Sequence, residues 1–488
     1  MSTTIQDLEP KAIWKHFSKL NAVPRASKKE EQVIEFMMQF GKSLGLETTL
    51  QDKVGNVIIK KPATPGMEDR KTTVLQSHLD MVHQKNNDTE FDFATEGIRM
   101  HVDGDWVKAD GTTLGADNGL GVATIMAILE SKDLPHPALE ALFTIDEETG
   151  MTGAKELDGS ILNGEILLNL DTEEDDEIGI GCAGGVDLTA TRFYIEESIP
   201  ENSLAYKLKL NGLQGGHSGM DIIKGLANAN VLMNRLLYSG YKSVNSRVAS
   251  IEGGGLRNAI PRESEAVVIL HQDQKAKFEN ELERVFHEIK SEFASLEPDM
   301  KFRMEQTELP KKIMSSDVQD AFLKSIYAAH NGVYRMSPDI EGLVETSNNI
   351  AKISLGEGKV EVLCLTRSSV DSSKDDLVNS LSSAFDLAGF QVNLSGDYPG
   401  WSPDPSSDIL KVVDRIYQEQ NQEKANVAAC HAGLECGILG SHYPEMDMIS
   451  FGPTIRGAHS PDERASISST QKFWKLTKEV LNQIPKKG

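Results

Sequence analysis

Four short apolar segments of this sequence lead into side chains that bind metal ions or carry protons. They lead into His78-Leu-Asp80, into Asp146-Glu147-Glu148, into Asp171, and into the stretch from Met448 that continues to His459. Asp117 joins this set from a glycine-containing turn that opens a helical pattern. Any strand must end in something polar, so one such coincidence means little. Four together, supplying imidazoles and carboxylates, indicate a site for zinc-like ions.

The number and types of these residues fit two ions better than one. Five ligands with one carboxylate shared would give each ion one imidazole, one terminal carboxylate and the bridge. The doubled Glu147-Glu148 can supply one ligand and one free general base, because adjacent residues leaving a strand point in different directions. An aspartate two residues after a ligand histidine, as in His78-Leu-Asp80, can hold the second ring nitrogen.

The segments around these residues predict an α/β domain. Apolar runs at 57–59, 73–76, 142–145, 166–170 and 448–451 predict strands, and three- and four-residue spacings predict helices at 8–21, 28–44, 119–132 and 469–484. Alternating strands and helices are typical of a mostly parallel sheet flanked by helices. Such sheets bind ligands beyond the carboxyl ends of their strands. We therefore expect the polar side chains to meet at one edge of the sheet.

The middle of the chain has a different rhythm and predicts an inserted α+β domain. One strand–helix–strand–strand–helix–strand series runs from about 206 to 306, and part of this order recurs from 316 to 396, which indicates an internal duplication. The expected domains are 1–184 and 398–488, which together form the catalytic domain, and 185–397, which forms a lid. A chain of 488 residues exceeds what one hydrophobic core usually supports.

Composition excludes several classes of partner. The sequence has 74 acidic and 50 basic side chains, a formal net charge of −24, which speaks against a nucleic-acid or membrane partner. Four cysteines give no disulfide framework, and no run reaches the ~18 apolar residues of a membrane span. The first residues lack the pattern of a signal peptide. We expect a cytoplasmic location.

The motifs together resemble a known family. They are His78-x-Asp80, Gly115-x-Asp117-Asn118, Asp146-Glu147-Glu148-x-Gly150, Asn169-x-Asp171, Gly215-Gly-His217-Ser-Gly219 and Ala458-His459-Ser. This set is similar to that of the co-catalytic zinc peptidases related to aminoacylase, glutamate carboxypeptidase and carnosinase. The resemblance covers essentially the whole chain and implies a zinc-exopeptidase-like catalytic domain.

The resemblance implies a role for each residue of the first set. One Zn²⁺ would be held by His78, Asp117 and Asp171, and a second by Asp117, Glu148 and His459, with Co²⁺ or Mn²⁺ possible. Asp80 would orient His78. Glu147 would take a proton from the attacking water and pass it to the leaving amine. The peptide between Asp117 and Asn118 would be cis.

The resemblance also implies how the lid takes part. His217 would reach from the lid to polarise the scissile carbonyl. Asn258 and Arg367 are expected to bind the substrate's carboxylate, since a guanidinium fork suits that geometry. His431 and Glu435, in the stretch His431-Ala-Gly-Leu-Glu-Cys436, are further candidates for substrate binding. A homodimer is expected, although a doubled lid could supply His217 within one chain.

Three functions remain open at this point. The first is metal-dependent hydrolysis of dipeptides in peptide catabolism, including Xaa-His dipeptides such as carnosine, which the long lid and the stretch 431–436 favour. The second is an N-acyl amino acid amidohydrolase with the same fold and metal chemistry. The third is a catalytically silent relative, which the complete set of ligands and the base at Glu147 argue against.

Overall fold

The computed structural model describes residues 4–46 and 49–488. The chain divides into two compact units. The first contains residues up to Gly181, Trp401–Ala429 and Leu434–Gly488, and the second contains Cys182–Gly400 and Cys430–Gly433. Residues 185–397 of the expected lid fall in the second unit, and its action as a lid remains a prediction.

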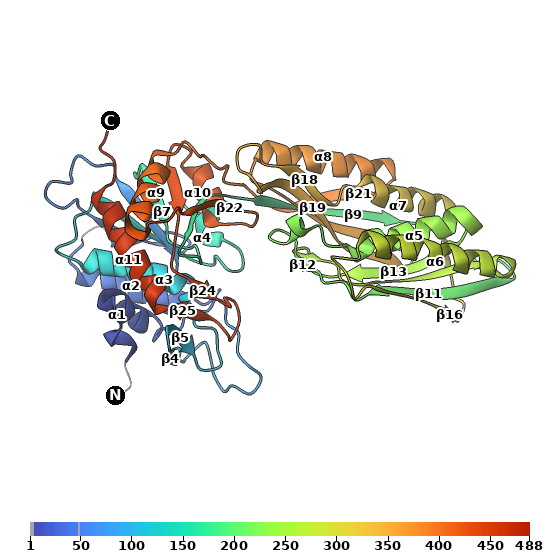
Figure 1. Ribbon diagram of the computed structural model, residues 1–488, viewed down its shortest axis with the longest axis horizontal. Helices are drawn as coiled ribbons and strands as arrows, with labels where there is room; N and C mark the ends of the chain where they lie inside the picture. The colour runs from blue at the N-terminus through green and yellow to red at the C-terminus, as the bar shows by residue number, and fades with distance from the viewer. Residues whose placement is uncertain (1–3, 47–48) are drawn as a thin grey trace. The chain divides into compact units, whose positions relative to one another are not determined.

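The first unit is built on a mixed eight-stranded sheet (Figure 1). In spatial order its strands are β1 (Thr49–Gln51), β2 (Val57–Lys61), β6 (Leu139–Thr144), β3 (Thr73–His78), β7 (Ile166–Asn169), β23 (Asp447–Ser450), β8 (Glu177–Cys182) and β22 (Asn426–Cys430). The four adjacent strands β6, β3, β7 and β23 are parallel, as the sequence predicted for this region. Strand β8 was not predicted, and it runs antiparallel to β23.

Helices flank this sheet. They are α1 (Lys11–Leu20), α2 (Glu31–Ser43), α3 (Ala116–Glu130), α4 (Thr152–Lys155), α9 (Asp408–Asn421), α10 (Glu435–His442) and α11 (Ile467–Asn482). Helix α3 is apolar all round and almost entirely buried, because it packs on β3 and is covered by α1. A small second sheet has the order β24 (Ile455–Arg456), β25 (Arg464–Ser466), β5 (Trp106–Ala109) and β4 (Met100–Asp103). Helices α9 and α10 were not predicted.

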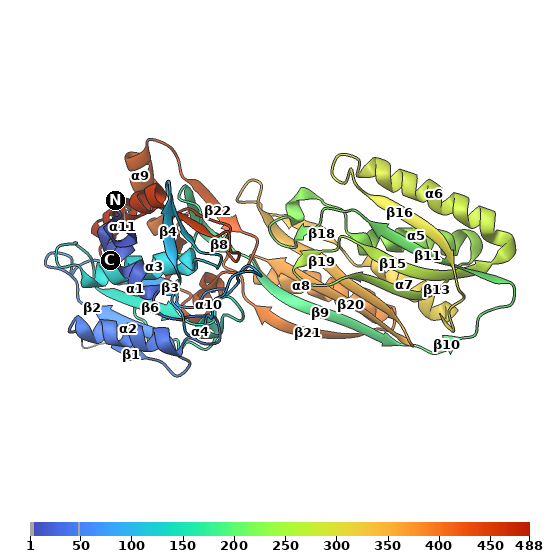
Figure 2. The same cartoon turned by 90° about the horizontal axis from the view of Figure 1, so that it is seen from below.

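The second unit is built on an antiparallel sheet (Figure 2). Its order is β16 (Lys301–Thr307), β11 (Ser203–Asn211), β15 (Ser264–His271), β13 (Arg247–Gly254), β19 (Val344–Gly356), β20 (Lys359–Ser368), β9 (Gly184–Phe193) and β21 (Gln391–Tyr398), with β18 (Gly332–Met336) paired to β19. Helices α5 (Ala229–Val244), α6 (Lys275–Glu292), α7 (Ser316–Ala328) and α8 (Asp371–Leu387) share one apolar core with the sheet.

The same strand order occurs in both halves of this sheet. The series β11-α5-β13-β15-α6-β16 has its counterpart in β9-α7-β19-β20-α8-β21, and the halves meet where β13 pairs with β19. The first strand of the second half is β9, which precedes the first half in the chain. The sequence pattern missed this strand and therefore showed only a partial repeat. The first half is thus nested inside the second.

The remaining short elements complete the description. Two small ribbons pair β12 (Gly216–His217) with β14 (Ala259–Ile260) and β10 (Glu196–Glu197) with β17 (Ile313–Met314). Short 3-10 turns lie at Ile5–Asp7, Ile222–Lys224 and Gln272–Gln274. Within residues 4–46 and 49–488, none of the helices combines the length and apolar character needed to cross a membrane.

Candidate active site

The predicted ligands of the first unit meet at the carboxyl ends of its parallel strands. His78 is the last residue of β3, Glu147 and Glu148 follow β6, and Asp171 follows β7. These strands are neighbours in the sheet, so residues distant in sequence come together beyond their ends. His459 lies on the loop between β24 and β25, with a left-handed backbone (φ 63°) that residues other than glycine rarely adopt.

Asp117 lies between the two histidines. Its Oδ1 is 3.1 Å from His78 Nε2, and its Oδ2 is 3.2 Å from His459 Nε2. His78 Nε2 is also 3.5 Å from Asp171 Oδ1, and His459 Nε2 is 3.0 Å from Glu148 Oε2. These residues form two groups, His78-Asp117-Asp171 and Asp117-Glu148-His459. Within each group the potential ligand atoms all lie within 4.8 Å of one another. Asp117, which belongs to both groups, is placed as a shared ligand would be.

The chemistry of these two groups suits metal ions. Among the described residues, Glu148 Oε1 is buried without a hydrogen-bond partner, and the buried Asp171 Oδ1 has only the 3.5 Å contact with His78. Hydrogen bonds that His459 donates to the carboxylates of Asp117 and Glu148 raise its pKa to about 11, so these carboxylates favour a positive charge at this position. Buried carboxylates without partners are costly unless a cation offsets their charge. The residues therefore fit two divalent ions, although their assignment as ligands remains a prediction.

The peptide bond between Asp117 and Asn118 is cis, which confirms the expectation from the resemblance. It lies at the start of α3, and the Asn118 side chain donates a hydrogen bond to the carbonyl oxygen of Leu170 (2.7 Å). The segment that carries Asp117 is thereby linked to the strand end that precedes Asp171.

Asp80 joins the histidine loop to the loop of the proposed base. Its Oδ1 lies 3.4 Å from His78 Nδ1 and accepts a hydrogen bond from the main-chain N–H of Glu147 (3.0 Å). Its Oδ2 accepts hydrogen bonds from the N–H of Glu148 (3.3 Å) and from the Ser27 hydroxyl (2.8 Å). Although burial opposes it, the bonds from His78 and Ser27 lower the pKa of Asp80. A charged carboxylate on Nδ1 leaves Nε2 of His78 free to bind a metal ion.

Glu147 lies outside the two groups that share Asp117, although with His78 and Glu148 it forms a third cluster of potential ligands. Its carboxylate comes within 4.8 Å of ligand atoms of His78 and Glu148. Burial, together with the nearby carboxylates of Asp171 and Glu435, raises the pKa of Glu147 well above the usual range. A carboxylate that binds protons readily, next to the two groups, has the properties of a general base.

Glu435 lies beneath the ligand loops, at the start of α10. Its Oε2 accepts hydrogen bonds from Gln76 Nε2 and Thr144 Oγ1, both 2.6 Å long. Gln76 in turn accepts a bond from Asn169, which accepts one from Ser450 (both 2.5 Å). Burial raises the pKa of Glu435 to about 7. A buried polar chain thus connects the ends of the four parallel strands.

Sequence reasoning missed Glu173. The acidic composition of the run 172–177 predicts a solvated loop, but only Asp176 in it is exposed, and Glu177 begins β8. Burial and the charges of Asp117 and Asp171 raise the pKa of Glu173 to about 8, which places it beside the ligands. Its position two residues after Asp171 was the signal available in the sequence.

The second unit holds the other predicted residues. His217 Nδ1 accepts hydrogen bonds from the N–H groups of Gly219 (3.2 Å) and Met220 (3.1 Å). Burial and the charge of Arg367 lower the pKa of His217, so its neutral ring carries the proton on Nε2. Asn258 is exposed, and its carbonyl oxygen accepts a bond from the N–H of Ser218 (2.8 Å) beside the β12–β14 ribbon. His217 is therefore held as a hydrogen-bond donor.

Arg367 and His431 lie near each other in this unit. Arg367 is buried on β20, donates to Tyr398 Oη (2.9 Å), and has an Nε without a hydrogen-bond partner. Burial raises the pKa of Asp187, although the charges of Arg257 and Arg367 oppose this shift. Asp187 forms its ion pair with Arg257 (3.3 Å) and not with Arg367. Burial and Arg367 lower the pKa of His431 to about 3.

Two neighbours of this pair escaped the sequence reasoning. Tyr398 accepts the hydrogen bond from Arg367. The hydroxyl of Ser347 lies 2.8 Å from His431 Nε2. A buried arginine without an anionic partner is suited to binding a carboxylate.

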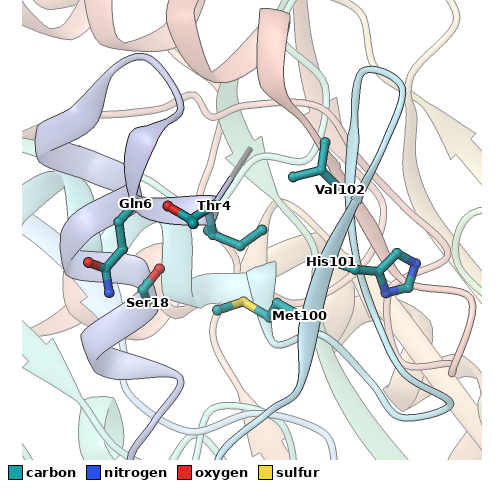
Figure 3. Close-up of a pocket in the computed structure, with 7 residues that line it drawn as sticks. Thr4, Gln6, Ser18, Met100, His101 and Val102 are labelled. Carbon is teal, nitrogen blue, oxygen red and sulfur yellow. The ribbon is translucent and has the colours of Figure 1, made fainter. Parts of the chain in front are cut away.

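A pocket elsewhere in the first unit lacks these features. It lies between the N-terminal turn and β4 and has a volume of about 850 Å³ (Figure 3). The figure shows His101 on the opposite side of the strand from Met100 and Val102. His101 pairs with Asp110 (2.6 Å). This pocket offers no group with evident chemistry.

The fold and the grouping of ligands define a class of metallopeptidase. The family model Peptidase family M20/M25/M40 matches residues 74–483, so the chain belongs to this family.

Two relatives match nearly the full length. The chain is 43% identical to the cytosol non-specific dipeptidase of Escherichia coli (strain K12), over 99% of each chain. It is also 43% identical to the crystal structure of aminoacylhistidine dipeptidase from Vibrio alginolyticus, with a TM-score of 0.95 over 100% of this chain and 99% of that one. An aminopeptidase, PepT, from Bacillus cereus shares the fold at 15% identity, with a TM-score of 0.57 and coverage of 98% and 99%. The resemblance found in the sequence is confirmed.

Proposed function

We propose that this protein is a metal-dependent dipeptidase that hydrolyses dipeptides, Xaa-His dipeptides such as carnosine among them. The observation that carries the proposal is the pair of three-residue groups that share Asp117 at the ends of adjacent strands. Full-length similarity to two proteins named dipeptidases supports the substrate class. Membership of the peptidase family supports hydrolysis of an amide bond.

One ion would be held by His78, Asp117 and Asp171, and the other by Asp117, Glu148 and His459. Zinc suits this mixture of imidazole and carboxylate ligands, and Co²⁺ or Mn²⁺ could replace it. Two such ions would lower the pKa of the attacking water and polarise the scissile carbonyl.

The chain's own residues would move the protons. Glu147 would accept a proton from the attacking water and deliver it to the nitrogen of the leaving amine. Its main-chain N–H is bonded to Asp80, which also contacts His78, so the base and one ligand share a support. This arrangement keeps Glu147 beside the ligands while leaving its carboxylate free of them.

The second unit would bind and orient the substrate. Arg367, with Asn258, would bind the free carboxylate, since the guanidinium is buried and has no ion-pair partner among the described residues. Nε2–H of His217 would donate a hydrogen bond to the oxygen that becomes negative during the attack. His431 would line the same site as a neutral imidazole. Glu435, also predicted to bind the substrate, is buried and bonded to Gln76 and Thr144, so it would support the strand ends instead.

Location and assembly follow as further parts of the proposal. The name of the Escherichia coli relative places that protein in the cytosol, and we propose the same location for this chain. We also propose a homodimer.

A substrate panel tests the proposal. Purified metal-loaded protein should cleave carnosine and other dipeptides, whereas dipeptide amides should react at least about 100-fold more slowly, because a cation tuned to a carboxylate rejects a neutral group. Tripeptides and N-acetyl amino acids keep the free carboxylate, and slower rates on them would show that the enzyme prefers dipeptides. The control is Glu147→Gln protein prepared in the same way. N-acetyl amino acids cleaved faster than dipeptides would instead identify an amidohydrolase and contradict the proposal.

A further inference from the structure

We infer that Arg25 and Glu463 are positioning residues that fix the loops carrying the proposed metal ligands in register with one another. The inference rests on the metal site of the proposed function and concerns two residues that contact none of the reacting groups. Both side chains are buried, each with 2% of its surface exposed. They carry opposite charges and bind main-chain groups of the ligand loops from inside the unit.

Glu463 binds four consecutive main-chain N–H groups. Its Oε2 accepts bonds from Leu114 (2.7 Å) and Gly115 (2.9 Å), and its Oε1 accepts bonds from Ala116 (2.7 Å) and Asp117 (3.2 Å). The left-handed conformation of Gly115 (φ 68°) helps successive N–H groups to converge on one anion. The carboxylate therefore fixes the segment that ends at the shared ligand.

The same carboxylate ties this segment to a second ligand loop. Glu463 follows His459 by four residues in the chain, on the segment that leads into β25. Asp117 and His459 belong to the same three-residue group, and their side chains are 3.2 Å apart. A shift of Glu463 would therefore change the distance between two ligands of one ion.

Arg25 binds the carbonyl groups of the same region. Its Nη1 donates to the carbonyl oxygens of Leu79 (3.1 Å) and Asp80 (3.2 Å), next to His78, and its Nη2 donates to that of Gly115. A side chain at Gly115 would come within 2.5 Å of Nη2, so the glycine allows this close approach. Arg25 thus joins the histidine loop to the loop that Glu463 binds.

Two buried charges acting on irregular backbone have a specific consequence. Loops at the ends of strands have main-chain groups without partners in the sheet, and each buried group needs a hydrogen bond. Arg25 provides donors for carbonyl oxygens, while Glu463 provides acceptors for N–H groups. Together they connect the segments that carry His78, Asp117 and His459. Outer groups of this kind typically change metal affinity about 10–100-fold when they are replaced.

The test is a Co²⁺ titration of chelator-stripped full-length protein, followed by calorimetry and visible absorption. Glu463→Gln keeps the shape but cannot accept four N–H bonds, so the ion bound by Asp117, Glu148 and His459 should bind about 10–100-fold more weakly than in the wild type. The other ion, whose further ligands His78 and Asp171 lie on other segments, should be affected less. Glu463→Asp, which keeps the charge, should recover part of the affinity.

Glu140→Gln is the matched control. Glu140 is 4% exposed, belongs to the same unit, and accepts bonds from the N–H groups of Asn163 (2.8 Å) and Gly164 (2.9 Å) far from the ligand loops. This variant should lose stability in thermal unfolding but bind both ions as the wild type does. If Glu463→Gln does not fold, Arg25→Lys, which keeps the charge but loses the fork, takes its place with weaker Co²⁺ binding expected.

Two results would overturn the inference. One is wild-type affinity for both ions in the folded Glu463 and Arg25 variants. The other is an equal loss of affinity in these variants and in Glu140→Gln, since that would reflect stability alone. Wild-type protein that binds two Co²⁺ ions but cleaves no dipeptide would contradict the proposed function and leave this inference intact.

Discussion

The two units contain buried polar groups of opposite character. In the first, carboxylates outnumber the imidazoles they contact, and among the described residues Glu148 Oε1 is buried without a hydrogen-bond partner. In the second, the buried Arg367 lies near two imidazoles and has no ion-pair partner among the described residues. Surplus negative charge is suited to cations and surplus positive charge to an anion. The comparison supports the proposal that the first unit holds the metal ions and the second binds the substrate's carboxylate.

The largest expected effect concerns the base in the first unit. Glu147→Gln should lower kcat for dipeptide hydrolysis by ~10²–10⁴-fold, because proton transfer is lost. Metal content, measured by elemental analysis, should stay near two ions per chain, because Glu147 belongs to neither ligand group. Retention of more than about a tenth of the activity would refute its role.

Glu148→Gln provides the contrasting variant. It removes a carboxylate that lies 3.0 Å from His459, so metal content and activity should fall together. Equal metal content in the Glu147 and Glu148 variants would remove the distinction between base and ligand.

The next effect concerns the histidine of the second unit. His217→Ala should lower kcat by ~10²–10³-fold with little change in KM, since a donor to a developing oxyanion acts mainly in the transition state. Metal content should not change, because the ligand groups lie in the other unit. A larger change in KM than in kcat would contradict this role.

Mixing two inactive variants shows which chain supplies His217. If the nested repeat serves its own chain, His217→Ala mixed with Glu147→Gln should give no activity. Recovered activity in the mixture would show that a partner subunit supplies the histidine.

Arg367 tests the anion site directly. Arg367→Gln should lower kcat/KM for dipeptides about 100-fold, since truncating one partner of a buried charge pair costs about 2–5 kcal/mol. Rates on dipeptide amides should hardly change, so the preference for a free carboxylate should disappear. Arg235→Gln, which removes an arginine paired with Glu292, is the control and should behave as the wild type. An unchanged preference in Arg367→Gln would place the carboxylate elsewhere.

The smallest effect concerns stability and pH. The folded pKa of His431 is about 3, below the ordinary value of 6.5, so the unfolded chain binds the extra proton first on acidification. The contribution of neutral His431 to the free energy of unfolding is fully present above pH 6.5 and is lost as the pH falls towards 3. Over this range the free energy of unfolding changes by at most about 1.4 kcal/mol per pH unit. His431→Gln should reduce the slope of the unfolding free energy in urea titrations over this range. An unchanged slope would show that folding does not lower the pKa of His431.

The sequence predicted the parallel strands and the residues at their ends because both signals are local. The apolar runs end next to His78, Glu148 and Asp171, so each strand end carries a potential ligand. Parallel strands bring such ends together at one edge of the sheet. The helices near 8–21 and 28–44 also follow from local spacing, and the structure confirms them as α1 and α2.

The rest depends on partners that are distant in the chain. Glu463 binds main-chain groups about 350 residues away, which no spacing in the sequence reveals. Strand β9 completes a repeat whose other strands, β20 and β21, come much later. The acidic composition of 172–177 predicts a solvated loop, and composition does not show that Glu173 is partly buried beside Asp171.

The central claim is that the carboxylate-rich groups around Asp117 bind two ions that dipeptide hydrolysis requires. The direct measurement is the rate of carnosine or other dipeptide cleavage as Zn²⁺ is added back stepwise to chelator-stripped protein, with bound metal determined at each step. The account predicts negligible activity without metal and a plateau at two bound ions per chain. Full activity in metal-free protein, or a plateau reached with one bound ion, would contradict it.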